Sequence, residues 1–168
     1  MPVRAAAETS GFTLIELVAV ILILSILAAI ALPQFLDLKA STYKTSVAQS
    51  AASFSTAINF AHLTCEVKNF AGQDNLPGFG TGIVDFNSNC YPSSTNGNNG
   101  NVNANRCLQI WNGVLALAPS ISTPANDTTD YRAQGSGTTC TYTYRKDTVT
   151  ARSFTYSTAN GAIVLNNP

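Results

Sequence analysis

Charged side chains are scarce in this sequence: Lys and Arg together number 9, Asp and Glu together number 9, and the two signs cancel. A nucleic-acid-binding domain normally carries a basic face, so this balance argues against a nucleic-acid partner. Histidine occurs once, as His62, and no Cys-x-x-Cys pair is present to form a zinc site. A G-x-S-x-G nucleophile motif is also missing. We therefore expect no enzyme activity, no cofactor and no metal.

A few polar residues could in principle bind a metal, but their spacing indicates turn and packing roles instead. Asp74, Asp85, Asn87 and Asn89 offer oxygen ligands of the kind that calcium prefers, but they lack EF-hand spacing and are better explained as turn residues. His62 follows an apolar position of a predicted helix and has no second histidine to join it. We expect it to serve in packing.

The four cysteines are even in number and widely spaced, at Cys65, Cys90, Cys107 and Cys140. This pattern predicts two disulfides formed in an oxidising compartment, with four buried free thiols as the alternative. Three pairings are possible, and the sequence alone does not choose among them. We favour Cys65–Cys90 with Cys107–Cys140, because each bridge would tie down a long irregular segment.

The longest uniform feature is an apolar run from Phe12 to Leu32, whose only charge is Glu16. As an α-helix it would span roughly 30 Å, which is the thickness of the hydrocarbon core of a bilayer. A secretory signal peptide has a shorter apolar region with a small-residue cleavage site after it. Here the small residue, Gly11, comes before the run. The pattern predicts a transmembrane helix and not an ordinary signal peptide.

Beyond Pro33 the apolar residues recur at alternating steps of four and three, which predicts one narrow stripe on an α-helix. The stripe comprises Leu36, Ala40, Tyr43, Val47, Ala51, Phe54, Ile58, Ala61 and Cys65. Glycine is absent from Phe12 to Phe70, and Pro33 is the only proline there. We therefore predict one helix of about 55 residues that is kinked or locally opened at Pro33.

The remainder of the chain changes in composition and period. Residues 71–138 are rich in Gly, Asn, Ser and Pro and predict an irregular connection, with a short strand at 82–86 and a helix near 106–118 capped by Asn105. In residues 139–168 apolar and polar side chains alternate, and Asn160-Gly161 predicts a type I′ hairpin turn. The fold class is thus α+β, with a long N-terminal helix packed on a C-terminal antiparallel sheet.

Glu16 is the costly group of the apolar run, since a carboxylate inside a membrane costs about 2.5–3.5 kcal/mol at the centre and less near an end. If the chain is cut between Gly11 and Phe12, the new amino group of Phe12 is cationic at neutral pH. We expect that Glu16 cannot easily turn back to its own terminus. The amine of a neighbouring subunit could instead neutralise it. A merely tolerated interfacial charge is the alternative.

The residues GFTLIE, followed by LVAVILILSILAAIALPQF, closely resemble the N-terminus of type IV prepilins. In that family a membrane peptidase cuts after the glycine and methylates the new N-terminal phenylalanine, and the glutamate at the fifth mature position guides filament assembly. The resemblance implies that Gly11 precedes the cut, that Phe12 becomes the methylated terminus, and that Glu16 is the assembly carboxylate.

The same resemblance implies a region where the helix melts in the filament. Pilins often open between a glycine and the proline of this segment, and here Ser25 stands in place of that glycine. The opening would therefore depend mainly on Pro33. Three further segments, LPQFLDLKA, NCYPSSTNG and RCLQIWNGVL, resemble pilins of the mannose-sensitive haemagglutinin class, whether major or minor subunits.

The resemblance implies a pilin-like fold in five parts. These are a leader at 1–11, a transmembrane and filament-core half of the helix at 12–33, an amphipathic half at 34–70, a variable connection at 71–138 and C-terminal strands at 139–168.

The implied function is that of a structural subunit of a type IV pilus used for surface attachment or motility. Its partners would be other copies of itself, the prepilin peptidase and methylase, and the pilus assembly machinery of the inner membrane. It would be a single-pass inner-membrane protein before assembly and extracellular afterwards. The alternatives are a pseudopilin of a type II secretion system and a membrane-anchored binding protein.

Overall fold

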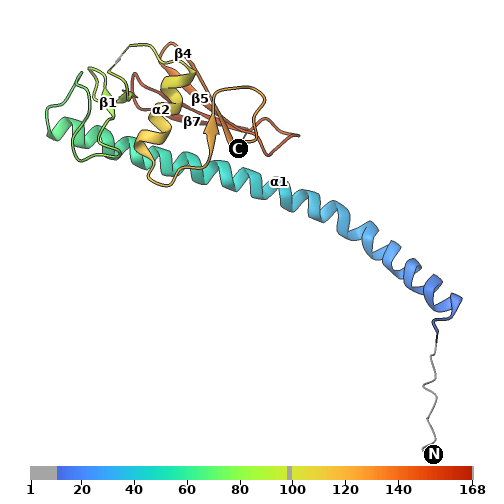
Figure 1. Cartoon of the computed structure of the whole chain (residues 1–168). Helices are drawn as coiled ribbons and strands as arrows, with labels where there is room; N and C mark the ends of the chain where they lie inside the picture. Colours follow the sequence, from blue (N-terminus) through green and yellow to red (C-terminus); the bar gives the residue numbers. More distant parts are fainter. Residues whose placement is uncertain (1–10, 98–99, 168) are drawn as a thin grey trace, which may run out of the picture. The chain divides into compact units, whose positions relative to one another are not determined.

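The computed structural model describes residues 11–97 and 100–167, and of Leu36 only the backbone. The expected leader therefore lies outside the described residues, except for Gly11. Figure 1 shows the elements in chain order. They are α1 (Leu14–Val67), β1 (Asp85–Phe86), β2 (Pro92–Ser94), α2 (Ala104–Val114), β3 (Ile121–Ser122), β4 (Tyr131–Ser136), β5 (Thr139–Tyr144), β6 (Ser153–Ser157) and β7 (Ile163–Asn166). The chain divides into two compact units, Met1–Ala40 and Ser41–Pro168.

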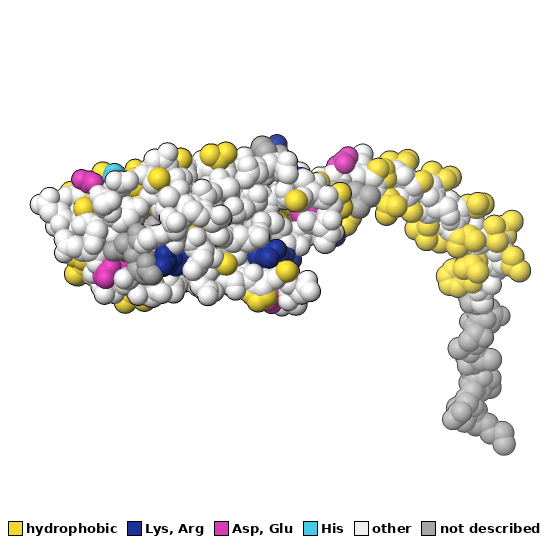
Figure 2. Space-filling model, turned by 90° about the horizontal axis from the view of Figure 1, so that it is seen from above, with side chains coloured by type: hydrophobic (Ala, Val, Ile, Leu, Met, Phe, Trp, Pro, Cys, Tyr) yellow, Lys and Arg dark blue, Asp and Glu magenta, His cyan; other side chains and the backbone are white. Residues whose placement is uncertain are grey.

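The described part of the first unit is the apolar beginning of α1. Its large hydrophobic side chains, as far as Leu38, are between 39% and 92% exposed, and Figure 2 shows them gathered over this part of the helix. By length and composition alone, helix α1 is long and apolar enough to cross a membrane. Helix α1 continues through Pro33. We predicted a kink or a local opening of the helix at Pro33. In the single chain the helix is not opened there.

The second unit contains a five-stranded sheet in the order β3-β4-β5-β6-β7 and a two-stranded sheet of β1 and β2. All neighbouring strands are antiparallel except β3 and β4, which are parallel. The α+β prediction is confirmed, because the part of α1 from Ser41 on packs with a sheet that is mostly antiparallel. The strand predicted at 82–86 is shorter than expected and comprises β1 alone.

Two local predictions were wrong in detail. Asn103, and not Asn105, caps α2, since its side chain accepts a hydrogen bond from the Arg106 N–H at 3.0 Å. The β6–β7 connection is not a two-residue type I′ turn, because Asn160 lacks the positive φ that such a turn requires. Instead five residues, 158–162, connect the two strands, and the Ser157 N–H donates to the Ala162 carbonyl across the turn at 2.9 Å.

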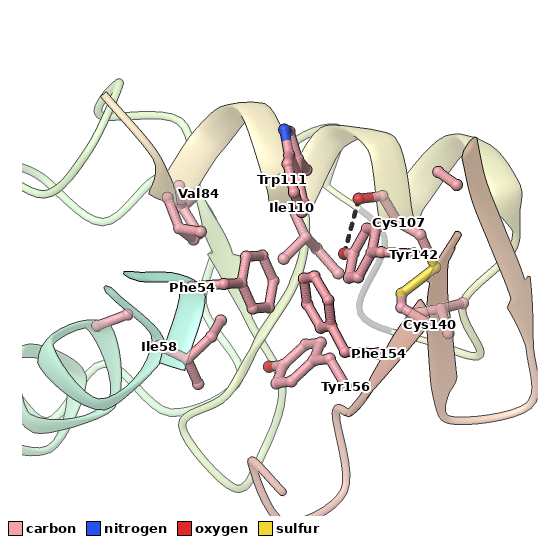
Figure 3. Packing of buried hydrophobic residues seen from close by; sticks show 14 of the residues in the cluster. Phe54, Ile58, Val84, Cys107, Ile110, Trp111, Cys140, Tyr142, Phe154 and Tyr156 are labelled. Atoms are coloured by element: carbon pink, nitrogen blue, oxygen red, sulfur yellow. Dashed lines mark hydrogen bonds between the residues drawn. A yellow bond between two sulfur atoms is a disulfide. The ribbon is translucent and has the colours of Figure 1, made fainter. Parts of the chain in front are cut away.

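The core of the second unit forms around the apolar stripe of α1. Six of its predicted members are at most 3% exposed, namely Val47, Ala51, Phe54, Ile58, Ala61 and Cys65. Phe54 lies at the centre, with its ring centroid 5.1 Å from that of Tyr142 and 5.7 Å from that of Trp111. Phe154 and Tyr156 of β6 complete the cluster, at 5.7 and 5.5 Å from Phe54 (Figure 3). Ring pairs at these distances contribute beyond the apolar area that they bury.

The polar atoms of this cluster find partners on backbone carbonyls. The Tyr142 hydroxyl donates to the Cys107 carbonyl at 2.9 Å, and the Tyr156 hydroxyl donates to the Pro92 carbonyl at 3.0 Å. Burial raises the pKa of both hydroxyls well above the ordinary value. Both tyrosines therefore remain neutral hydrogen-bond donors, which is the form that a buried site tolerates.

Both disulfides have the pairing favoured above. Cys65–Cys90 joins the last turns of α1 to the segment before β2, and Cys107–Cys140 joins α2 to β5, with Cα–Cα distances of 5.6 and 5.5 Å. No cysteine of the described residues is free. Each bridge restricts the unfolded chain, which stabilises a domain by about 2–4 kcal/mol.

We predict that Phe54 and Phe60, which both lie on α1, differ sharply in their contribution to stability. Phe54→Ala should lower the free energy of unfolding by about 3–5 kcal/mol, because it leaves a cavity among four rings. Phe60→Ala should lower it by less than about 1.5 kcal/mol, because Phe60 is 62% exposed and contacts mainly Phe79. Thermal unfolding followed by near-UV circular dichroism measures both; equal losses would contradict the central role of Phe54.

Candidate functional site at the amino terminus

Helix α1 begins with a capping box formed by Thr13 and Glu16. The Thr13 N–H and the Thr13 hydroxyl both donate to Glu16 Oε2 at 2.8 Å. In return the Glu16 N–H donates to Thr13 Oγ1 at 3.4 Å. A Thr-x-x-Glu pair of this kind satisfies backbone donors that the first turn of a helix leaves without partners. The one charged side chain of the apolar run therefore also closes the end of its own helix.

The start of α1 corrects the premise of one sequence prediction, while the pairing of Glu16 with the amine of a neighbouring subunit stays a prediction. We expected that Glu16 cannot easily turn back to its own terminus, on the assumption that the terminus continues the rigid helix. The structure begins α1 at Leu14, so Thr13 precedes the helix and its donors fold over the carboxylate. The Ser/Thr-x-x-Glu spacing was visible in the sequence and could have revealed the cap.

The residues on either side of the predicted cut are open to other molecules. Phe12 is 92% exposed. A Cβ atom built on Gly11 would meet nothing within 4 Å. The fold itself therefore does not require glycine at position 11, and any requirement for a small residue there has to come from a molecule that reads this segment.

Ser25 and Pro33 affect the hydrogen bonding of the same helix differently. The Ser25 hydroxyl donates to the Ile21 carbonyl at 2.6 Å, so its polar group is satisfied inside α1. Pro33 has no N–H to donate, which leaves the carbonyl one turn before it without its usual helical partner. Helix α1 is therefore expected to open more easily at Pro33 than at Ser25.

Two of the other polar residues singled out above, Asp85 and His62, have structural roles. Asp85 is buried and accepts hydrogen bonds from the Asn75 N–H, the Ser94 hydroxyl and the Gly97 N–H at 2.7–3.0 Å. His62 hydrogen-bonds the Cys90 carbonyl through Nδ1 at 3.0 Å. Among residues 11–97 and 100–167, no group of three or more His, Cys, Asp or Glu side chains is arranged to hold a metal ion.

We predict that Thr13→Val, which keeps the size but removes the hydroxyl, frays the first turn of α1. Losing a helix cap costs about 0.5–2 kcal/mol, which corresponds to roughly two- to thirtyfold faster exchange of the Glu16 amide hydrogen. Hydrogen–deuterium exchange of the detergent-solubilised chain measures this rate. Thr13→Ser, which retains the hydroxyl, is the matched control and should exchange like the wild type; identical rates in all three would exclude the cap.

Comparison with known proteins bears on this same segment. The family model described as the prokaryotic N-terminal methylation motif matches residues 9–32. No curated protein and no solved structure matches the chain. The matched residues contain Gly11, the capped start of α1 and most of its exposed apolar part. This chain therefore carries the N-terminal methylation motif that is the hallmark of type IV prepilin- and pilin-like proteins.

Proposed function

We propose that this chain is a structural subunit of a type IV pilus. It is made as a prepilin, cut after Gly11, methylated on Phe12, and polymerised through its N-terminal helix into a fibre that serves surface attachment or motility. The observation that carries the proposal is an exposed apolar helix with one capped carboxylate, located inside a methylation motif. The five-part division of the chain, from the leader at 1–11 to the strands at 139–168, belongs to this proposal.

The motif implies processing by a prepilin peptidase and handling by the assembly machinery. The apolar start of α1 fits anchoring in the inner membrane before assembly. The pilin-like family is structural, and we propose no enzymatic activity for this chain. Other copies of the chain are the proposed partners within the fibre, and the proposed final location is an extracellular pilus.

In the assembly step Glu16 exchanges one set of donors for another. Before assembly its carboxylate is held by the two Thr13 donors. After the cut, a cationic Phe12 amine on a neighbouring subunit offers a charged donor, and charge-assisted hydrogen bonds are roughly twice as strong as neutral ones. An unpaired carboxylate in an apolar fibre core would be strongly destabilising, so the pairing selects the register in which neighbours meet.

The apolar surface of the first unit supplies the contact between copies. Without a hydrophobic driving force inside a bilayer, helices associate through packing and polar contacts, and the exposed side chains between Phe12 and Leu38 are available for that packing. Local opening at Pro33 during assembly would let successive helices adjust their spacing. Ser25 has its own hydrogen bond within the helix, so we place the opening closer to Pro33.

The alternative with the same motif is a pseudopilin of a type II secretion system. The four cysteines and the long Asn-rich connection favour a true pilin, and the presence of Glu16 argues against a tip subunit, since those often lack this residue. Membership in the mannose-sensitive haemagglutinin class, as a major or a minor subunit, also remains a proposal. Electron microscopy of cells that lack the chain separates these roles: missing fibres indicate a major subunit, scarce or altered fibres a minor one, and unchanged fibres with impaired secretion a pseudopilin.

We predict that Glu16→Ala leaves the chain processed and membrane-bound but abolishes its incorporation into fibres, because the core then lacks the partner for the Phe12 amine. Immunoblotting of sheared surface fibres and of membranes measures the two pools. Glu66→Ala removes the exposed glutamate near the other end of α1 and should leave incorporation unchanged. Normal fibre incorporation of Glu16→Ala would contradict the assembly role.

We also predict that Gly11→Val blocks the cut. Mass spectrometry should then find an intact precursor, heavier than the mature chain by the leader of residues 1–11, with no methyl group on Phe12. The substitution should leave the thermal unfolding of the chain unchanged, because the added side chain has open space around it. Cleavage of Gly11→Val at the wild-type rate would refute the assignment of the processing site.

A further inference from the structure

The surface of the Ser41–Pro168 unit contains an open cavity with polar side chains and a volume of about 450 Å³. It lies between the loop that follows β3, the ends of β4 and β5, and the loop that leads to β6. Its lining has no aliphatic side chain larger than those of Ala125 and Ala151. The ring of Tyr144, which also borders the cavity, packs against Tyr43 and Tyr131 at centroid distances of 5.7 and 5.2 Å. Polar and charged side chains therefore line the cavity together with one aromatic ring and two alanines.

One wall of the cavity is held in place by Arg145. Its guanidinium donates to the Ala125 carbonyl at 2.8 Å and to the Ser122 hydroxyl at 3.1 Å, and it also contacts the Pro124 and Asp127 carbonyls. These hydrogen bonds fix the loop from Ser122 to Asp127 against the end of β5. The cavity is thus preformed, and a ligand would not have to order this loop on binding.

The two carboxylates of the cavity already have partners. Asp147 receives hydrogen bonds from the Thr150 N–H at 2.9 Å and from Arg152 Nε at 2.7 Å, which hold the pKa of Asp147 below its ordinary value. The Ser122 hydroxyl and the Thr128 N–H likewise lower the pKa of Asp127. Both groups are therefore ionised at neutral pH and compensated by neighbours within the fold.

The second arginine, Arg132, differs from all of these groups. Its Nε donates a long hydrogen bond to the Thr123 carbonyl at 3.4 Å. Within residues 11–97 and 100–167, its two terminal nitrogens form no hydrogen bond and no ion pair. Arg132 pairs with Thr143 across β4 and β5, so the two side chains are neighbours on one face of the sheet. The cavity therefore presents the Arg132 guanidinium, whose terminal nitrogens have no partner among the described residues, beside the Thr143 hydroxyl.

These groups select a class of ligand. A guanidinium with two free terminal nitrogens suits bidentate binding of a carboxylate. The Thr143 hydroxyl and the Asn126 amide offer neutral donors and acceptors, which match the hydroxyl groups of a sugar ring. The volume is within the range of small-molecule sites. An acidic peptide fits less well, because the cavity has no aliphatic pocket for neighbouring side chains.

We propose that this cavity binds a carboxylate-bearing sugar residue of a surface polysaccharide, with Arg132 holding the carboxylate and Thr143 and Asn126 contacting the ring hydroxyls. The site would make the subunit an adhesin as well as a building block. The proposal goes beyond the assembly role and uses no residue of the N-terminal motif, so either can fail without the other.

The test is a binding titration of the full chain in detergent, followed by saturation-transfer NMR. The probes are methyl β-glucuronide, the methyl glycoside of sialic acid, the neutral methyl β-glucoside, and N-acetylaspartate amide as a peptide carboxylate. We expect one of the two acidic sugars to bind at least tenfold more tightly than the neutral glucoside and the aspartate derivative. Which of them binds tells whether the carboxylate belongs to a uronic acid or a sialic acid.

Two variants and one control locate the binding site. Arg132→Gln should weaken binding of the acidic sugar at least tenfold, and Thr143→Val should weaken it several-fold, with the thermal unfolding midpoint of each showing that the fold is retained. Arg106→Gln is the control, because Arg106 lies on α2, contacts the Asn101 carbonyl and does not border the cavity.

Several results would overturn the proposal. Equal binding of the glucuronide and the glucoside would show that the site does not recognise the carboxylate. Binding of the aspartate derivative without either acidic sugar would show a peptide site. Wild-type affinity in Arg132→Gln and Thr143→Val, or no binding of any probe, would remove the cavity as a ligand site.

Discussion

The second unit depends on the insertion of one side chain, Phe54, between a helix and a sheet. Four aromatic rings from α2, β5 and β6 lie with their centroids within 5.7 Å of its own. Because interiors are packed as densely as organic crystals, the positions of these rings follow from one another. The hydroxyl of Tyr142 then binds the carbonyl of Cys107, so the aromatic cluster and the disulfide to Cys140 hold the same two elements together.

Helix α1 serves two environments with one backbone conformation. Its apolar beginning exposes leucine, isoleucine and valine all round, whereas from Val47 to Cys65 only one narrow stripe is buried and the remaining positions are mostly polar. The change lies in side-chain chemistry, because the backbone is helical on both sides of Pro33. A helix that is hydrophobic all round requires lipid or other helices as its surroundings, and an amphipathic one requires a single packed face.

Features with a strong local period could be predicted from the sequence. The regular spacing of apolar residues predicted the buried stripe of α1 and the alternating burial in β5 and β6. The α+β arrangement follows from these two patterns. The details that failed depend on competition among neighbours. Asn103 and Asn105 are both good caps, and the residue preference alone does not choose between them. Gly161 turns where the ring of Tyr91 approaches so closely that a Cβ atom would lie 2.3 Å from it, and no local pattern encodes that contact. The cavity beside Arg132 is formed by residues of separate strands and loops, and no motif in the sequence predicted it.

The capping box at Thr13 has a consequence for timing. Thr13 lies on the mature side of the predicted cut, so removal of the leader takes away neither of the donors that hold Glu16. If the proposed cut takes place, precursor and processed chain would share the same helix end, and Glu16 would keep both Thr13 donors in each of them. Assembly would then begin as an exchange of those donors for the amine of a neighbouring subunit, and not as the burial of an unpaired carboxylate.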